Sequence, residues 1–310
     1  VATRKSGLTL RRTIVAMASL PEEPQQKPTR WQRAVVREIR RKAGKRAGEP
    51  LSEEDWGAVW TMHATGSGRL MHRLWAALPG NPRCGMCGAP FSRPGSLVVG
   101  PLGYRPSRKN PHICSTCVEA SPPGGMKMPT GVLFADLRGF TASSEGVDPG
   151  EVSGLLRRFY GCAEKVFFPE AVIDKLIGDE VMALYLPYLG INDSRPVPEL
   201  MLGQARELLA AVGYGSGSDP FVELGIGLDY GEAYVGNIGD REVYDFTAVG
   251  DVVNTASRLQ AQAGAGEIIY SDRVAAELAN PPGTEVELEL KGKASSQRAY
   301  RLCVEPRTGD

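Results

Sequence analysis

The fold of this chain is decided by the stretch Phe134-Ala135-Asp136-Leu137-Arg138-Gly139-Phe140-Thr141, in which one carboxylate follows an apolar run. A second stretch further along has the same character and reads Lys175-Leu176-Ile177-Gly178-Asp179-Glu180. Short apolar runs bounded by glycine are typical of strands. Asp136 and Asp179 are therefore each expected at a strand end or in a turn. Two aspartates placed in this way can hold a pair of divalent cations over a nucleoside triphosphate.

A third stretch runs from Thr247 to Arg258 and reads TAVGDVVNTASR. We predict a helix over residues 251–262. Asn254 and Arg258 are four residues apart and so share one face of it. Val252, Ala256 and Leu259 form a different, apolar face. One face of this helix is expected to pack, while the other reaches a ligand.

In these three stretches the chain resembles the catalytic domain of class III nucleotidyl cyclases, from about residue 130 to residue 302. The resemblance implies an α+β, ferredoxin-like fold with a mainly antiparallel sheet flanked by helices. It implies an adenylate cyclase that converts ATP to 3′,5′-cyclic AMP and pyrophosphate. Asp136 and Asp179 match the aspartates that bind two Mg²⁺ or Mn²⁺ ions. Asn254 matches the residue that orients the ribose, and Arg258 the residue that stabilises charge on the transferring phosphorus.

Two further positions bear on the choice of base. Lys175 and Thr247 match the positions that read the purine in this family. Lysine suits adenine, which offers acceptors at N1 and N7, whereas guanylate cyclases tend to have glutamate there. Many adenylyl cyclases have aspartate at the second position, but threonine occurs in a bacterial-like subset and can hydrogen-bond the 6-amino group. ATP is therefore favoured, with GTP as the alternative substrate.

Lys291, in Leu-Lys-Gly-Lys-Ala, matches a lysine that contacts the terminal phosphates, although a basic hairpin tip explains it almost as well. In the family the active site forms between two catalytic domains. One supplies the metal-binding aspartates, and the other supplies the lysine, threonine, asparagine and arginine. Because this chain carries the complete set, the resemblance implies a symmetric homodimer with two equivalent sites.

Rival functions also follow from the sequence. One is a catalytically weak or inactive cyclase fold that senses nucleotides or binds nucleic acid. Degenerate relatives usually lose a metal-binding aspartate or the Asn/Arg pair, and neither is lost here. Another is a diguanylate cyclase, but Gly178-Asp179-Glu180 matches only part of the turn motif that such an enzyme would require.

Four of the six cysteines form two pairs, Cys84-x-x-Cys87 and Cys114-x-x-Cys117. Two such pairs can complete a tetrahedral site of four thiolates. We predict structural zinc, with an iron–sulfur cluster as the alternative and free or disulfide-bonded thiols as a third option. His112 is an alternative ligand. The expected role of this module is to stabilise, through its metal ion, a segment that is rich in glycine and proline and has little apolar periodicity.

The remaining sequence predicts the organisation of the chain. Residues 1–30 form a basic, unstructured segment, residues 31–79 a helical segment, residues 80–125 the four-cysteine module with a linker at 121–125, and residues 130–303 the cyclase-like domain. Residues 1–50 contain thirteen Lys and Arg but four Asp and Glu. Such a segment can contact nucleic acid or a membrane surface, but we favour a solvated role. No run approaches the ~18 apolar residues of a membrane helix. We therefore predict no transmembrane segment and a cytoplasmic location.

Periodicity gives the expected elements. Helices are predicted over residues 31–42, 152–168, 198–212 and 251–262, with a further helix that starts after Ser52 and runs through Trp60. Strands are predicted from Val132 onward and over residues 171–177, 181–185, 222–228, 232–235, 267–270, 285–290 and 299–303. Two hairpin turns are expected, at Gly178-Asp179 and at Asp229-Tyr230-Gly231.

Overall fold

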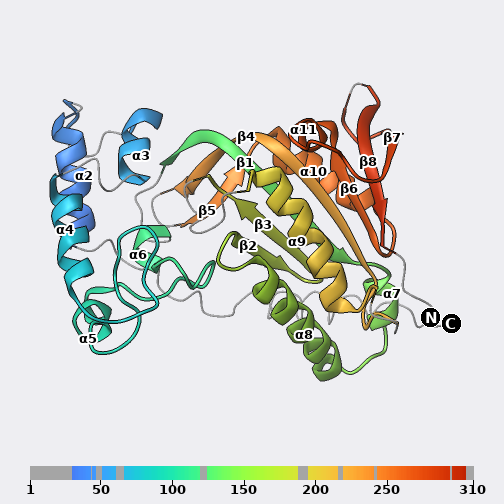
Figure 1. The fold of residues 1–310 in the computed structure, drawn as a ribbon, viewed down its shortest axis with the longest axis horizontal. Coiled ribbons are helices and arrows are strands. Elements are labelled where there is room, and N and C mark those ends of the chain that lie inside the picture. Colours follow the sequence, from blue (N-terminus) through green and yellow to red (C-terminus); the bar gives the residue numbers. More distant parts are fainter. Residues whose placement is uncertain are drawn as a thin grey trace, which may run out of the picture.

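The computed structural model describes residues 30–42, 44–46, 51–60, 66–118, 124–187, 195–215, 219–240, 243–293 and 295–304. The predicted basic segment 1–30 lies outside this part of the chain, except for Arg30. Two bodies are visible in Figure 1. One is built on a sheet and the other on short helices and loops. We call residues 124–303 the sheet domain and residues 80–118 the cysteine module.

The sheet domain is organised around one eight-stranded sheet. The strand order is β2–β3–β1–β4–β6–β8–β7, and β5 also pairs with β4. Only the β4–β6 pair is parallel among the strands that the structure describes, so the sheet is mainly antiparallel. The strands are β1 (Gly124–Leu137), β2 (Val172–Ile177), β3 (Glu180–Tyr185), β4 (Leu224–Asp240), β5 (Val243–Val249), β6 (Glu267–Ser271), β7 (Thr284–Leu288) and β8 (Gln297–Cys303).

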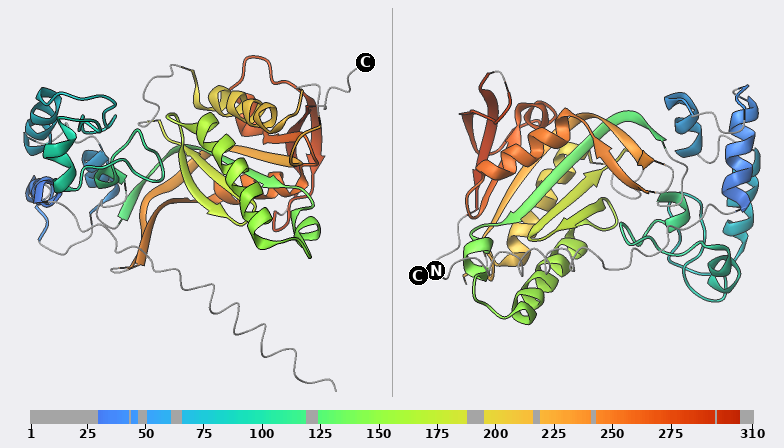
Figure 2. Two further views of the ribbon diagram at one scale, coloured as in Figure 1. Left: turned by 90° about the horizontal axis from the view of Figure 1, so that it is seen from below. Right: turned by 180° about the vertical axis from the view of Figure 1, so that it is seen from behind.

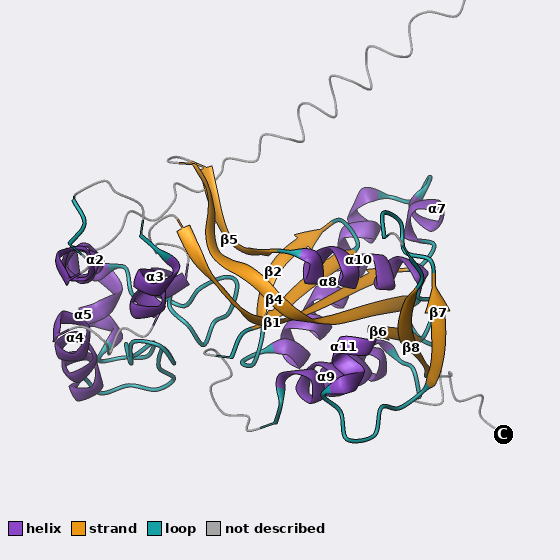
Figure 3. Cartoon of the chain, turned by 90° about the horizontal axis from the view of Figure 1, so that it is seen from above, coloured by secondary structure: helices purple, strands orange, loops and turns teal. Residues whose placement is uncertain are grey.

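Helices cover both faces of the sheet (Figure 3). Alternate residues of β1 point to opposite faces, as the pleat requires. Leu133 and Ala135 join a core with α8 (Pro149–Phe167), α9 (Val197–Val212) and α11 (Asp272–Ala276). Val132 and Phe134 join a second core with α10 (Asp251–Gln262). A short helix, α7 (Phe140–Ser144), follows β1. The predicted α+β architecture is confirmed.

The predicted hairpin at Asp229-Tyr230-Gly231 is wrong. These residues lie inside β4, which runs without a break along β1, so that Asp229 faces Val132 and Gly231 faces Thr130. Asp229 is fully buried and accepts hydrogen bonds from Ser271 Oγ at 2.6 Å and Arg273 Nε at 3.0 Å. An aspartate and a glycine that would suit a turn are thus held in a strand by partners distant in sequence.

Other boundaries also differ from the prediction. β1 begins at Gly124, inside the stretch predicted as a linker, because its first half pairs with the second half of β4. β5 was not predicted, and it pairs with β4 from Tyr234 to Asp240. The final strands are shifted by a few residues, with β7 ending at Leu288. The remaining predicted helices and strands of the sheet domain are present.

The helical segment contains α2 (Arg30–Lys42), α3 (Glu53–Trp60) and α4 (Gly66–Ala77). Ser52 starts α3 as predicted, because its Oγ accepts from Asp55 N at 3.3 Å while its own N–H donates to Asp55 Oδ2 at 2.8 Å. The cysteine module contains three short helices, α5 (Ser96–Val99), η2 (Gly100–Leu102) and α6 (Ser115–Val118). No helix in the described ranges has the length and apolar character that crossing a bilayer requires.

The cysteine module and the sheet share one continuous hydrophobic core. Tyr104 and Ile113 of the module belong to the same buried cluster as Val132 of β1, and so do Met71 and Trp75 of α4. The two views of Figure 2 show the module against the end of the sheet where β4 and β5 project. The module is therefore packed onto the sheet domain and is not an independent domain joined only by a linker.

Candidate active site and cysteine centre

The two predicted metal-binding aspartates lie at the same end of the sheet. Asp136 is the second-last residue of β1, and Asp179 lies in the turn between β2 and β3. β1 pairs with β3 so that Asp136 faces Glu180, and Leu137 N donates to the carbonyl of Asp179 at 3.3 Å. The pairing of these two strands is what brings together carboxylates that are distant in the sequence.

The electrostatics of this cluster favour a bound cation. Burial raises the pKa of Asp136, Arg138 opposes that shift, and the charge of Asp179 adds to it. Burial also raises the pKa of Glu180, and the charges of Asp136 and Asp179 contribute. Arg138 donates to the Asp136 carboxylate and offsets part of the negative charge. Half-buried carboxylates that repel one another are suited to hold divalent metal ions through oxygen ligands.

Helix α10 presents the predicted polar pair as expected. Val252, Ala256 and Leu259 are buried, while Asn254 is exposed and Arg258 half-buried. The helix packs so closely on β4 that a Cβ on Gly227 would lie 2.2 Å from Gln260 N. Glycine at this position is therefore required for the helix to approach the sheet.

The turn that carries Lys291 lies next to Arg258. A Cβ on Gly292 would lie 3.3 Å from Arg258 Nη2, and Lys291 beside it is exposed. Among the described residues, no hydrogen bond or ion pair joins Asn254 or Arg258 to the aspartates of the same chain. The structure thus places Arg258 beside the turn that carries Lys291, and it places Asp136 close to Asp179.

The two positions that the sequence predicts to read the purine are linked through a third residue. Lys175 is exposed on β2, and Thr247 lies on β5 with 8% of its surface accessible. Thr247 Oγ1 donates to Asp174 Oδ2 at 2.6 Å, and Asp174 immediately precedes Lys175. The two positions are therefore neighbours, although they are far apart in the sequence.

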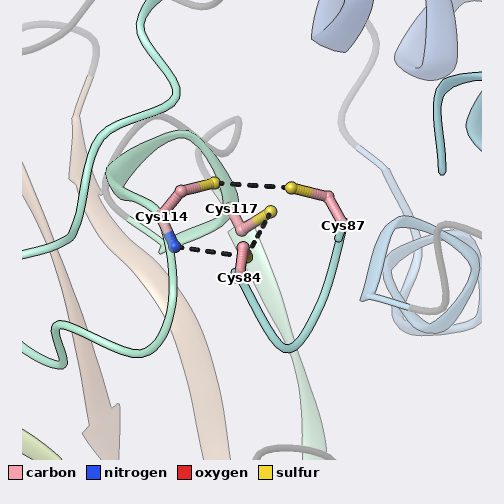
Figure 4. A group of neighbouring side chains, drawn as sticks. All are labelled: Cys84, Cys87, Cys114 and Cys117. Atoms are coloured by element: carbon pink, nitrogen blue, oxygen red, sulfur yellow. Dashed lines mark hydrogen bonds between the residues drawn. The ribbon is translucent and has the colours of Figure 1, made fainter. Parts of the chain in front are cut away.

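The four paired cysteines converge on one point (Figure 4). Their sulfur atoms all lie within 4.8 Å of one another, with Cys84 Sγ 4.0 Å from Cys117 Sγ and Cys87 Sγ 3.7 Å from Cys114 Sγ. Ligands of a tetrahedral zinc–thiolate site are about 3.8 Å apart, because each Zn–S bond is about 2.3 Å long. Disulfide sulfurs would be about 2 Å apart. The geometry fits a metal centre and not a pair of disulfides.

The chemistry of this buried group agrees with its geometry. Burial raises the pKa of the Cys114 thiol, and hydrogen bonding to the neighbouring sulfurs raises that of Cys117. Four buried thiols cannot all ionise without a compensating cation, which a metal ion supplies. Among the described residues the group consists of these four sulfurs, and His112 lies outside it.

The family model for the adenylate and guanylate cyclase catalytic domain matches residues 126–302. This chain belongs to the adenylate and guanylate cyclase family. The matched range begins within β1, ends within β8 and contains every cyclase position predicted from the sequence. The α+β sheet is thus that of a cyclase catalytic domain.

Individual relatives support the same assignment. The cyclase domain is 30% identical over 183 residues to an adenylate cyclase from Anabaena cylindrica, covering 55% of this chain and 36% of the relative. It is 31% identical over 134 residues to adenylate cyclase 1 from Rhizobium meliloti, covering 41% and 20%. The chain therefore spans well under half the length of these relatives. The solved guanylyl cyclase Cya2 aligns with a TM-score of 0.51 and 28% identity, over 57% of this chain and 93% of Cya2.

Three residues near the cyclase site were not predicted as part of it. Arg138 pairs with Asp136, Asp174 accepts a hydrogen bond from Thr247, and Lys109 of the cysteine module bonds to Asp174 at 3.0 Å. Arg138 lies within residues 134–141, and Asp174 directly precedes Lys175. The sequence around Lys109 gave no indication of this role, because its partners Asp174 and Phe246 lie 65 and 137 residues further along the chain.

Proposed function

We propose that this protein is an adenylate cyclase that converts ATP to 3′,5′-cyclic AMP and pyrophosphate with two Mg²⁺ or Mn²⁺ ions per site. The observation that carries the proposal is the convergence of Asp136 and Asp179 at one end of the sheet, with complementary polar residues presented elsewhere on the same domain. Bound metal ions lower the pKa of the ribose 3′-hydroxyl and neutralise charge on the triphosphate. Asp136 and Asp179 would hold them.

The other residues act on the nucleotide. Asn254 orients the ribose, Arg258 stabilises charge on the transferring phosphorus, and Lys291 contacts the terminal phosphates. Since Arg258 lies beside the turn of Lys291, and no hydrogen bond or ion pair joins either residue to the aspartates within the described part of the chain, we propose that each site is completed across a homodimer. The presence of all the matching residues on one chain supports this arrangement. Lys175 and Thr247 favour ATP, and similarity to the guanylyl cyclase Cya2 makes GTP the second candidate.

A direct assay tests the proposal. We expect the purified protein, incubated separately with ATP and GTP in the presence of Mn²⁺, to form cyclic AMP and pyrophosphate in equal amounts, and much less cyclic GMP. Product identity by chromatography and mass, with EDTA as the control, checks the result. A protein that binds nucleotide without forming either cyclic product would instead be a cyclase-fold regulator. Predominant cyclic GMP would make it a guanylate cyclase.

We also propose that Cys84, Cys87, Cys114 and Cys117 hold one structural zinc ion, which closes the cysteine module before β1. We expect purified protein to contain about one zinc per chain, and Cys84→Ser to lose it, because three thiolates bind a tetrahedral ion less well than four. Elemental analysis and limited proteolysis before residue 124 provide the measurement. Cys303→Ser is the matched control, since Cys303 is exposed and lies outside the cluster. Iron with visible-range absorbance would contradict the choice of zinc.

A further inference from the structure

A loop of the cysteine module lies along the outer strand of the sheet. β2 is the edge strand, and Ile173 N donates to the carbonyl of Lys109 at 2.9 Å. Next to it, Asn110 Nδ2 donates to the carbonyls of Pro169 at 2.8 Å and Ala171 at 2.9 Å. Both loop residues stand between the two cysteine pairs. The module therefore extends the hydrogen bonding of the sheet at its exposed edge.

The strand is irregular at this contact. The register between β2 and β3 shifts between Ile173 and Lys175, so Asp174 is the extra residue of a bulge. A bulge turns a side chain away from its regular direction, and bulges are common beside active sites. Here the Asp174 side chain is fully buried, whereas Lys175 is exposed.

Lys109 fixes the position of the Asp174 carboxylate. Its Nζ lies 3.0 Å from both the carbonyl and Oδ1 of Asp174, 2.7 Å from the carbonyl of Phe246 and 2.9 Å from Asp245 Oδ1. An ammonium has three N–H donors and no acceptor, so these partners account for all of them. Because the Lys109 side chain is only 14% exposed, water competes little for these bonds.

The second oxygen of Asp174 decides the hydrogen-bond direction at Thr247. Asp174 Oδ2 lies 2.6 Å from Thr247 Oγ1. An ionised carboxylate only accepts hydrogen bonds, so the hydroxyl proton of Thr247 must point to Asp174. The other oxygen, Oδ1, accepts in the same way from Lys109 Nζ at 3.0 Å. Thr247 Oγ1 can therefore offer only lone pairs to a further partner.

We infer that Asp174 determines purine specificity by making Thr247 an obligate acceptor, and that Lys109 is a positioning residue that holds Asp174 in place. This inference rests on the proposed function, in which Lys175 and Thr247 face the base. Adenine carries an amino group at C6, from which Thr247 Oγ1 can accept a hydrogen bond. Its N1 is unprotonated and can accept a hydrogen bond from Lys175. Guanine carries a carbonyl at C6 and N1–H, so both contacts are repulsive. A binding site discriminates strongly against a base that leaves the polar groups of the site without hydrogen-bond partners.

The test compares kcat/KM for ATP and GTP in the whole 310-residue chain. Asp174→Asn keeps the shape of the side chain but introduces an amide donor, which frees the Thr247 proton to turn toward a guanine carbonyl. We expect the ATP:GTP ratio of kcat/KM to fall by about tenfold or more, mainly through a higher KM for ATP. Lys109→Met should shift the ratio in the same direction by a smaller factor. Lys165→Met, an exposed lysine on α8, is the matched control and should leave the ratio unchanged.

A double-mutant cycle separates this role from a structural one. In a Thr247→Val background no hydroxyl remains to orient, so Asp174→Asn should change the ratio by less than about twofold. A purely structural role would lower turnover of both nucleotides alike in either background and leave the ratio unchanged. That result in a folded, ATP-selective protein would overturn the inference. If Asp174→Asn does not fold, Lys109→Met decides, and an unchanged ratio overturns the inference equally. A wild-type protein that cyclises neither nucleotide would instead refute the proposed function.

Discussion

Asp136→Ala is expected to reduce cyclic AMP formation by at least about 10³-fold, because a metal ion contributes several kcal/mol to transition-state stabilisation and about 1.4 kcal/mol corresponds to a factor of ten. Asp179→Ala should have a similar effect. Two metal ions would need the oxygen ligands of both carboxylates, so neither aspartate can replace the other. Initial rates with ATP across a range of Mn²⁺ concentrations provide the measurement.

The fold of these variants should persist. The Asp136 side chain is 24% exposed, and its removal relieves repulsion with Asp179 and Glu180. Thermal unfolding should therefore show a midpoint close to that of the wild type. Glu287→Ala is the matched control, since it removes an exposed carboxylate from β7 at the other side of the sheet and should retain full activity. Normal turnover by either aspartate variant would remove that residue from the proposed metal site.

Mixing two inactive variants should restore activity if each site is shared between chains. Asp136→Ala damages the metal-binding half of both sites in a homodimer, and Asn254→Ala damages the ribose-orienting half. In a mixed dimer one site collects both lesions and the other collects none. Random exchange of equal amounts makes half of the dimers mixed, so activity should recover to about one quarter of the wild-type value if the sites are independent.

A second mixture provides the control. Asp136→Ala and Asp179→Ala both damage the metal-binding half, so a mixed dimer of these variants contains no intact site and should stay inactive. Subunit exchange should be demonstrated for both mixtures with differently tagged chains. Equal recovery in both mixtures, or no recovery in the first despite exchange, would show that the site is not divided in the proposed way.

The cysteine module gains significance from its contacts. It shares a hydrophobic core with β1, and its loop bonds to β2 next to Lys175, one of the two residues proposed to read the purine. A metal centre that closes this loop would hold Lys109 against Asp174. Loss of the metal should therefore affect both the stability of the segment before β1 and the choice of nucleotide, without any change in the metal-binding aspartates.

The sequence by itself determined the features that are encoded locally. The apolar run before Asp136, the glycine turn at Asp179 and the helical spacing of Asn254 and Arg258 each lie within a few residues, so short-range geometry fixes them. The Ser52 cap and the two C-x-x-C pairs were predictable for the same reason. These signals gave the α+β class, the family resemblance and the candidate residues.

Only the tertiary structure decided what depends on distant partners. Asp229-Tyr230-Gly231 has the composition of a turn, but continuous pairing with β1 and the bonds of the buried Asp229 carboxylate to Ser271 and Arg273 hold it within a strand. Likewise, nothing near Lys109 in the sequence shows that its ammonium reaches Asp174 and Phe246. Local propensity is worth less than about 1 kcal/mol per residue, whereas removing one partner of a buried ion pair, such as that of Lys109 with Asp174, costs about 3–5 kcal/mol. Long-range partners therefore override the local pattern at these positions.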